Sequence, residues 1–164
     1  MIPDPETQNI LQSEIDRLSA TYNTPAFSPH ITVGKFPDHS IANAGEVLRQ
    51  IVMPIKHREI FFGNTVAGNS PYQKLTVEVE PSPLFTELKS AISDLFGNNF
   101  NKDEYHASLM YGQIPTQNLN QETERSVLKS LQNSFAHKLV AVDISGQPKE
   151  WIAVATEEFK SSRN

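Results

Sequence analysis

Two histidines in this sequence are each followed, two residues later, by a hydroxyl side chain. His30 and Thr32 lie in SPHITVGKF, and His106 and Ser108 lie in YHASLMYG. Both stretches are short and apolar, which is typical of β-strands. Because residues i and i+2 of a strand point to the same face, each histidine should project together with its hydroxyl. The sequence therefore predicts two His-hydroxyl pairs, each presented on one face of a strand.

Two imidazoles in one pocket are suited to general acid–base catalysis. An unperturbed histidine pKa near about 6.5 allows one ring to be neutral while the other is charged. Displacement at phosphorus needs a base that activates the nucleophile and an acid that protonates the departing oxygen. We therefore interpret His30 and His106 as candidate catalytic residues. Thr32 and Ser108 are candidate donors to the non-bridging phosphate oxygens. Core histidines satisfied by local hydrogen bonds are the alternative explanation.

The other three histidines lack this context, and we interpret them as surface or boundary residues. They are His39, His57 and His137. A zinc site needs three or four convergent ligands, and no His-x-x-x-His or Glu-x-x-His spacing occurs in the chain. We therefore expect no metal and no cofactor.

The elements that would position the two motifs follow the same order in each half of the chain. The first half is predicted to contain a helix at 4–22, a strand at 30–36, a helix capped by Ser40 and stopped by Pro54, and strands at 58–63 and 72–79. The second half is predicted to contain a helix that Ser82 caps and Gly97 ends, a strand at 105–112, a helix from Asn118 or Asn120 to Phe135, and strands at 137–144 and 151–156.

This repetition predicts an α+β fold built from two pseudo-symmetric αβαββ halves. The half-repeats would cover roughly 4–80 and 82–158 of a single domain, residues 1–164. If they pack about an approximate two-fold axis, equivalent strands meet and their polar side chains face one central cleft between antiparallel sheets. His30 and His106 would then be the two halves of one active site.

Composition limits the classes of partner. The 164 residues include 14 Lys and Arg against 19 Asp and Glu, with a net charge of −5, and the basic residues are scattered. A long nucleic acid usually binds a basic face, so we expect a small anionic substrate instead. There is no cysteine, no signal-peptide pattern and no apolar run of membrane length. We expect a cytoplasmic monomer without membrane partners.

HITV and HASL resemble the two His-x-Thr/Ser-x signatures of the 2H phosphoesterase superfamily. Within it, PAFSPHITVG, YHASLMYG and WIAVA are similar to the cyclic phosphodiesterase branch of plants and yeast. The resemblance implies a two-lobed fold with a central cleft, a role in RNA metabolism, and metal-independent hydrolysis of a nucleoside 2′,3′-cyclic phosphate, or of ADP-ribose 1″,2″-cyclic phosphate, to the 2′-phosphate. By the family's arrangement His106 is the base and His30 the acid.

The resemblance also implies that an aromatic at the position of Tyr111 stacks on the base. Strict strand alternation would place Tyr111 opposite His106, so we expect it in the site only if the strand ends or bulges near Met110. Tyr72 and Trp151 are further candidate substrate-binding aromatics, with core or edge packing as the alternative.

The RNA-ligase-like branch usually has an arginine soon after its second motif, and this chain has Met110, Tyr111 and Gly112 there, which favours the cyclic phosphodiesterase branch. The chain departs from that branch at two points, because it lacks the proline that commonly precedes the second histidine and the cysteines of plant members.

Two other functions stay open. RNA-end processing or 2′–5′ RNA ligase-like chemistry would use the same four residues in a longer groove, and a non-catalytic module would bind nucleotides without turnover.

Overall fold

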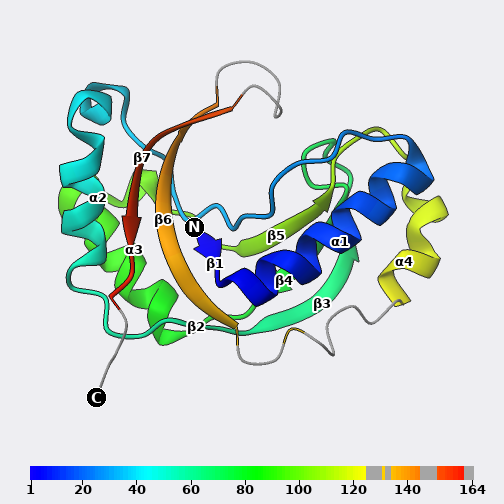
Figure 1. Cartoon of the computed structure of the whole chain (residues 1–164), viewed down its shortest axis with the longest axis horizontal. Coiled ribbons are helices and arrows are strands. Elements are labelled where there is room, and N and C mark those ends of the chain that lie inside the picture. Colours follow the sequence, from blue (N-terminus) through cyan, green and yellow to red (C-terminus); the bar gives the residue numbers. More distant parts are fainter. Residues whose placement is uncertain (125–130, 132–133, 145–150, 161–164) are drawn as a thin grey trace.

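The strands of the protein form two antiparallel sheets, and helices pack around them (Figure 1). The computed structural model describes residues 1–124, 131, 134–144 and 151–160, to which all statements below refer. The helices are α1 (Pro5–Tyr22), α2 (Ala44–Val52), α3 (Pro83–Phe96) and α4 (Asn120–Glu124), with 3-10 turns η1 (Asp38–Asn43), η2 (Asn98–Phe100) and η3 (Thr116–Leu119). The strands are β1 (Ile2–Pro3), β2 (Glu59–Ile60), β3 (Phe62–Ala67), β4 (Leu75–Val79), β5 (Tyr105–Met110), β6 (Ser134–Asp143) and β7 (Ile152–Glu158).

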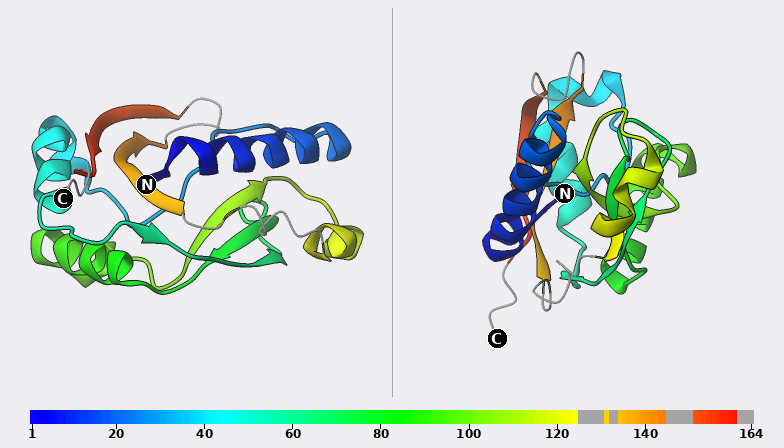
Figure 2. Two further views of the ribbon diagram at one scale, coloured as in Figure 1. Left: turned by 60° about the horizontal axis from the view of Figure 1, so that its bottom comes forward. Right: turned by 90° about the vertical axis from the view of Figure 1, so that its right-hand side faces the viewer.

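In the first sheet β6 pairs with β1, β2 and β7, and in the second the order is β3-β4-β5. The predicted α+β class is therefore confirmed. Each predicted half contributes to both sheets, because the β3–β4 hairpin pairs with β5, whereas β6 pairs with β1 and β2. In Figure 2, α2 and α3 lie at one end of the molecule and α4 at the other.

The predicted strand at 58–63 is two strands. β2 ends at Ile60 and pairs with β6 of the first sheet, whereas β3 begins at Phe62 and pairs with β4 of the second. Phe61 between them is exposed. The chain thus changes sheets within a run that reads as one apolar strand.

Local sequence explains both long helices, which are confirmed. Asp4 caps α1, where its Oδ1 accepts a hydrogen bond of 3.0 Å from the Thr7 amide. α3 begins at Pro83 after the N-cap Ser82 and ends at Gly97, whose φ of 86° favours glycine. The apolar face of α1 is buried and packs against β5.

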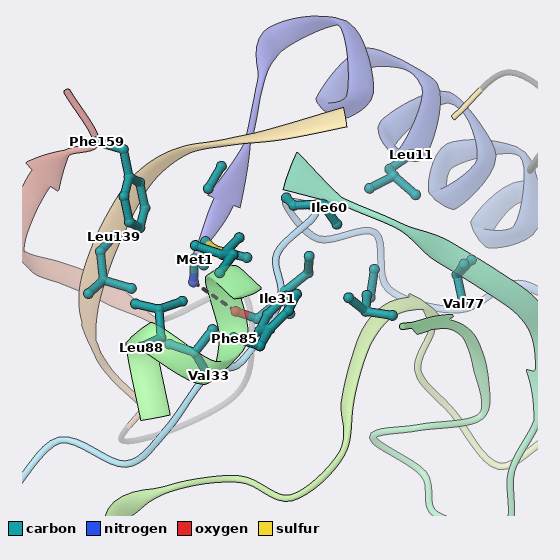
Figure 3. Packing of buried hydrophobic residues seen from close by; sticks show 14 of the residues in the cluster. Met1, Leu11, Ile31, Val33, Ile60, Val77, Phe85, Leu88, Leu139 and Phe159 are labelled. Atoms are coloured by element: carbon teal, nitrogen blue, oxygen red, sulfur yellow. Dashed lines mark hydrogen bonds between the residues drawn. The ribbon is translucent and has the colours of Figure 1, made fainter. Parts of the chain in front are cut away.

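The amino-terminal residue meets the first motif within the hydrophobic core (Figure 3). The Met1 amine donates to the Ile31 carbonyl at 2.7 Å, and the Ile31 amide donates to the Met1 carbonyl at 2.9 Å. Ile31 is completely buried. This exchange fixes the backbone on either side of Ile31, and with it the histidine and threonine of the motif.

Three predictions of local structure were wrong. Residues 30–36 make only isolated bridges, at Ile31 and Gly34, because their neighbours are single residues of distant segments. Ser40 lies within η1, and the N-cap of α2 is Asn43. Phe135 belongs to β6 rather than to the end of a helix. The expected helix is described only as far as Glu124, so its predicted continuation, like the turn at 145–150, lies outside the described residues.

Within the part of the chain that the structure describes, no helix is long and apolar enough to span a membrane.

Candidate active site

The two motifs lie side by side in the fold. Ile31 and Ala107 form an antiparallel bridge. Continuing that register by one residue in each direction aligns His30 with Ser108 and Thr32 with His106. Directly opposed side chains of antiparallel segments have Cβ atoms about 4.5–5.5 Å apart. The four polar residues of the motifs therefore gather on one face, over the junction of the two sheets.

His30 is held in one tautomer. Its Nδ1 lies 2.9 Å from the Ser28 carbonyl oxygen, which can only accept, so Nδ1 carries a proton and Nε2 is the atom available to a substrate. Burial lowers the pKa of His30, the Ser28 carbonyl opposes this shift, and the positive charges of the Met1 amine and Lys102 add to it. In the free protein His30 is therefore biased toward the neutral form.

His106 lies on β5, opposite Glu78 of β4. Burial lowers the pKa of His106, the positive charges of Lys102 and His30 lower it further, and the carboxylate of Glu104 raises it. The positive charge of a protonated His30 therefore acts on the His106 imidazole. Protonation of His30 disfavours protonation of His106.

The two hydroxyls differ in their surroundings. Ser108 is only 6% exposed, and its hydroxyl makes a long contact of 3.4 Å with the Tyr72 carbonyl. Thr32 is exposed. Both hydroxyls can donate a hydrogen bond to an anion bound over the face that carries the histidines.

Tyr111 lies beside Ser108 because β5 is irregular. The register passes from Leu75 opposite Met110 to Thr76 opposite Ser108, which leaves Leu109 as an extra residue, and β5 ends at Met110. The strand thus ends and bulges near Met110, as the presence of Tyr111 in the site requires. Burial raises the pKa of the Tyr111 phenol, and the Ser108 hydroxyl counteracts that shift.

The other two predicted aromatics also lie at the site. The Tyr72 ring meets the edge of Tyr111 with centroids 6.1 Å apart, and it is 57% exposed. Trp151 packs edge-to-face with His30 at 6.0 Å. The Trp151 indole Nε1 is buried and has no hydrogen-bond partner among the described residues.

A groove of about 620 Å³ begins at His106 and is lined by residues of β3, β4, α3 and the loop before β5. Its charged residues other than His106 are four carboxylates and two lysines, namely Glu78, Glu80, Asp103, Glu104, Lys89 and Lys102. The ammonium of Lys89 lies 2.9 Å from Asp103. The groove therefore carries an excess of negative charge that begins beside His106.

Sequence reasoning missed three residues of the site. Phe27 packs between Tyr111 and His30, with ring centroids 3.9 Å and 6.3 Å away respectively. Ser28 sets the His30 tautomer through its backbone, and Lys102 acts on the pKa of both histidines. Phe27 and Ser28 lie within the proline-flanked run that precedes His30, and this run was the sequence feature that could have indicated them. Lys102 lies in a polar loop whose sequence has no feature that indicates a role in the site.

The described residues contain no group of three or more His, Cys, Asp or Glu side chains that could hold a metal ion.

Comparison with known proteins identifies a family for the chain. No curated protein matches the chain. The family model described as cyclic phosphodiesterase-like protein matches residues 1–159, a range that includes both motifs and Trp151. With nearly its whole described length matched, the chain belongs to the cyclic phosphodiesterase-like protein family.

Proposed function

We propose that this protein hydrolyses nucleoside 2′,3′-cyclic phosphates to 2′-phosphates, with His30 and His106 moving the protons and no metal ion required. The observation that carries the proposal is the Ile31–Ala107 bridge, which sets the two His-hydroxyl motifs in register. Membership of the cyclic phosphodiesterase-like family supports the general class of reaction.

The reaction is an in-line displacement at phosphorus. His106 removes a proton from water as the water oxygen bonds to phosphorus, and the bond from phosphorus to O3′ breaks. His30 gives a proton to O3′, which leaves a 2′-phosphate and a free 3′-hydroxyl. Nδ1 of His30 is occupied by Ser28, so Nε2 carries that proton. Relief of strain in the five-membered ring contributes to the driving force.

Thr32 and Ser108 donate hydrogen bonds to the non-bridging oxygens, where negative charge increases in the transition state. The nucleoside packs against the exposed Tyr72 ring, which Tyr111 supports, and near Trp151 beside His30. Stacking on an aromatic ring binds every base through its π-face, so it favours nucleosides without selecting strongly among them.

The charge of the groove favours a short substrate. An oligonucleotide carries further phosphates, and four carboxylates line the groove that extends from His106. RNA-end processing and 2′–5′ RNA ligase-like activity are therefore disfavoured relative to hydrolysis of a mononucleotide. ADP-ribose 1″,2″-cyclic phosphate, with its charged diphosphate, is the less favoured of the small substrates.

The test is incubation of the protein with each of the four nucleoside 2′,3′-cyclic phosphates in EDTA, with 2′- and 3′-phosphate products resolved by chromatography. We expect turnover and only the 2′-phosphate. Rates on cyclic-phosphate-ended oligonucleotides of increasing length should fall. Binding without turnover would instead identify a non-catalytic nucleotide-binding module.

Matched histidine variants test the mechanism. His30→Ala and His106→Ala should each lower kcat by about 10²–10⁴-fold with folding retained. His57→Ala is the control, since His57 contacts Glu87 of α3 and belongs to neither motif. Full activity of either motif variant would contradict the mechanism.

A further inference from the structure

Lys102 stands at the junction of the two motifs. It follows Asn101, which forms an antiparallel bridge with Gly34, and only two residues separate it from β5. The Lys35 amide donates to the Phe100 carbonyl at 2.8 Å on the same side of that bridge. The loop that carries Lys102 is therefore attached directly to the segment that carries His30.

The side chain of Lys102 faces the site. It lines the groove described above and also a smaller recess of about 280 Å³, shared with His106, Gln73, Asp103 and Glu104. Lys102 is partly buried, and burial lowers its pKa. The neighbouring carboxylate of Asp103 is 2.9 Å from Lys89. Among the described residues no carboxylate lies within ion-pair distance of Lys102, so its charge is available to a ligand.

An anion between the two histidines would complete this arrangement. A cyclic phosphodiester carries one negative charge, and the pentacoordinate transition state carries more. Thr32 and Ser108 are neutral donors, whereas a hydrogen bond from an ammonium group is roughly twice as strong. We infer that the Lys102 ammonium binds a non-bridging oxygen of the cyclic phosphate, an inference that rests on the proposed function and adds to it a residue outside both motifs.

This contact would also couple substrate binding to proton transfer. In the free protein the charge of Lys102 lowers the pKa of both histidines. The other charges acting on them are the Met1 amine at His30, and His30 and Glu104 at His106. A bound phosphate offsets the charge of Lys102, so that His30 can hold the proton that O3′ needs. The acid is thus protonated mainly when substrate is present.

The experiment compares Lys102→Met with Lys102→Arg and with a control, Lys35→Met. Lys35 is an exposed lysine near the first motif and does not line either groove. We expect Lys102→Met to lower kcat/KM by about 10- to 100-fold, Lys102→Arg to recover part of that loss, and Lys35→Met to have little effect. Urea denaturation should give all four proteins nearly equal free energies of unfolding.

Two measurements need no turnover. Inorganic phosphate should bind Lys102→Met several-fold more weakly than the unchanged protein in calorimetry. The ring-proton NMR signals of His30 and His106 should titrate at higher pH in Lys102→Met and not in Lys35→Met. Unchanged phosphate affinity together with unchanged histidine titration would overturn the inference. If these measurements behave as expected but the unchanged protein does not hydrolyse cyclic phosphates, the anion site stands and the proposed function fails.

Discussion

Phe27 and Tyr111 stack face to face, with ring centroids 3.9 Å apart and planes inclined by 12°. The stack covers one face of Tyr111, whose side chain is only 6% exposed. Tyr72, which meets Tyr111 edge-on, is 57% exposed and keeps surface for a ligand. Phe27 and Tyr111 therefore form a buried support, and Tyr72 is the exposed ring available to a base. The family resemblance instead associated Tyr111 with the base.

Tyr72→Ala should weaken substrate binding without affecting folding. Stacking of one base on an aromatic ring contributes about 1–3 kcal/mol, so KM should rise by about tenfold while kcat changes little. Steady-state kinetics on one purine and one pyrimidine 2′,3′-cyclic phosphate would measure this. An unchanged KM for both would show that the base lies elsewhere.

Tyr111→Ala should behave differently, because it removes a buried ring and exposes Phe27. We expect the free energy of unfolding to fall by about 3 kcal/mol, as measured by urea denaturation. Tyr111→Phe keeps the stack and serves as the control, with a much smaller loss. Equal stability of Tyr111→Ala and the unchanged protein would contradict the supporting role.

The activity should have an acidic optimum in kcat/KM. Burial and nearby positive charge lower the pKa of both histidines below the ordinary value of about 6.5. The profile of kcat/KM reports the free protein, in which one ring must be neutral and the other protonated. Its maximum lies between the two pKa values, and we therefore expect it below about pH 6.5. A maximum above pH 7 would contradict these environments.

The lowered pKa values of the two histidines also make the folded protein less stable in acid. A histidine whose pKa is lower in the folded protein binds its proton more readily when unfolded, so stability declines as pH falls below about 6.5. The Met1 amine, whose pKa burial lowers to about 5, acts in the same direction. Chemical denaturation between about pH 5 and 7.5 should therefore show a weaker pH dependence in the double variant His30→Gln, His106→Gln. Identical slopes would mean that the histidines titrate normally.

Local sequence was sufficient for some elements and not for others. α1 and α3 could be predicted because their caps and apolar faces lie within the helices themselves, as at Asp4 and Gly97. Residues 30–36 alternate like a strand, but their hydrogen-bond partners are distant in sequence, Met1 on one side and Ala107 on the other. No local pattern can show that such a segment bridges two sheets.

The residues of the site likewise differ in whether local sequence or a distant contact places them. The His-x-hydroxyl spacing identified four residues because the i, i+2 geometry is a property of any extended segment. Lys102 lies in a polar loop, and it reaches the site only because Asn101 is bridged to Gly34. A role that depends on a tertiary contact of the neighbouring residue has no signature in composition or spacing.

The assignment of His30 as the acid and His106 as the base can be tested with a substrate that has a bridging sulfur in place of O3′. A thiol has a pKa near about 8.5, far below that of a ribose hydroxyl, so a thiolate leaves without needing a proton. On a 3′-thio 2′,3′-cyclic phosphate, His30→Ala should recover most of its lost rate, whereas His106→Ala should remain impaired. Recovery of His106→Ala instead would reverse the roles.

Gly34 should be sensitive to substitution, because two backbones cross there. A Cβ at this position would lie 2.7 Å from the Phe100 carbonyl oxygen, a backbone atom that cannot rotate away. Gly34→Ala must therefore displace the loop that leads through Asn101 and Lys102 to β5. Overpacking of this kind costs about 1–3 kcal/mol of stability, and kcat/KM should fall because the loop carries Lys102 and leads to His106.

Gly45→Ala in α2 is the matched control, since its Cβ would meet nothing within 4 Å. That variant should gain up to about 1 kcal/mol from the better helix propensity of alanine and keep full activity. Thermal unfolding and steady-state kinetics of both variants would decide the matter, and a Gly34→Ala protein as stable and active as Gly45→Ala would show that the crossing does not position the site.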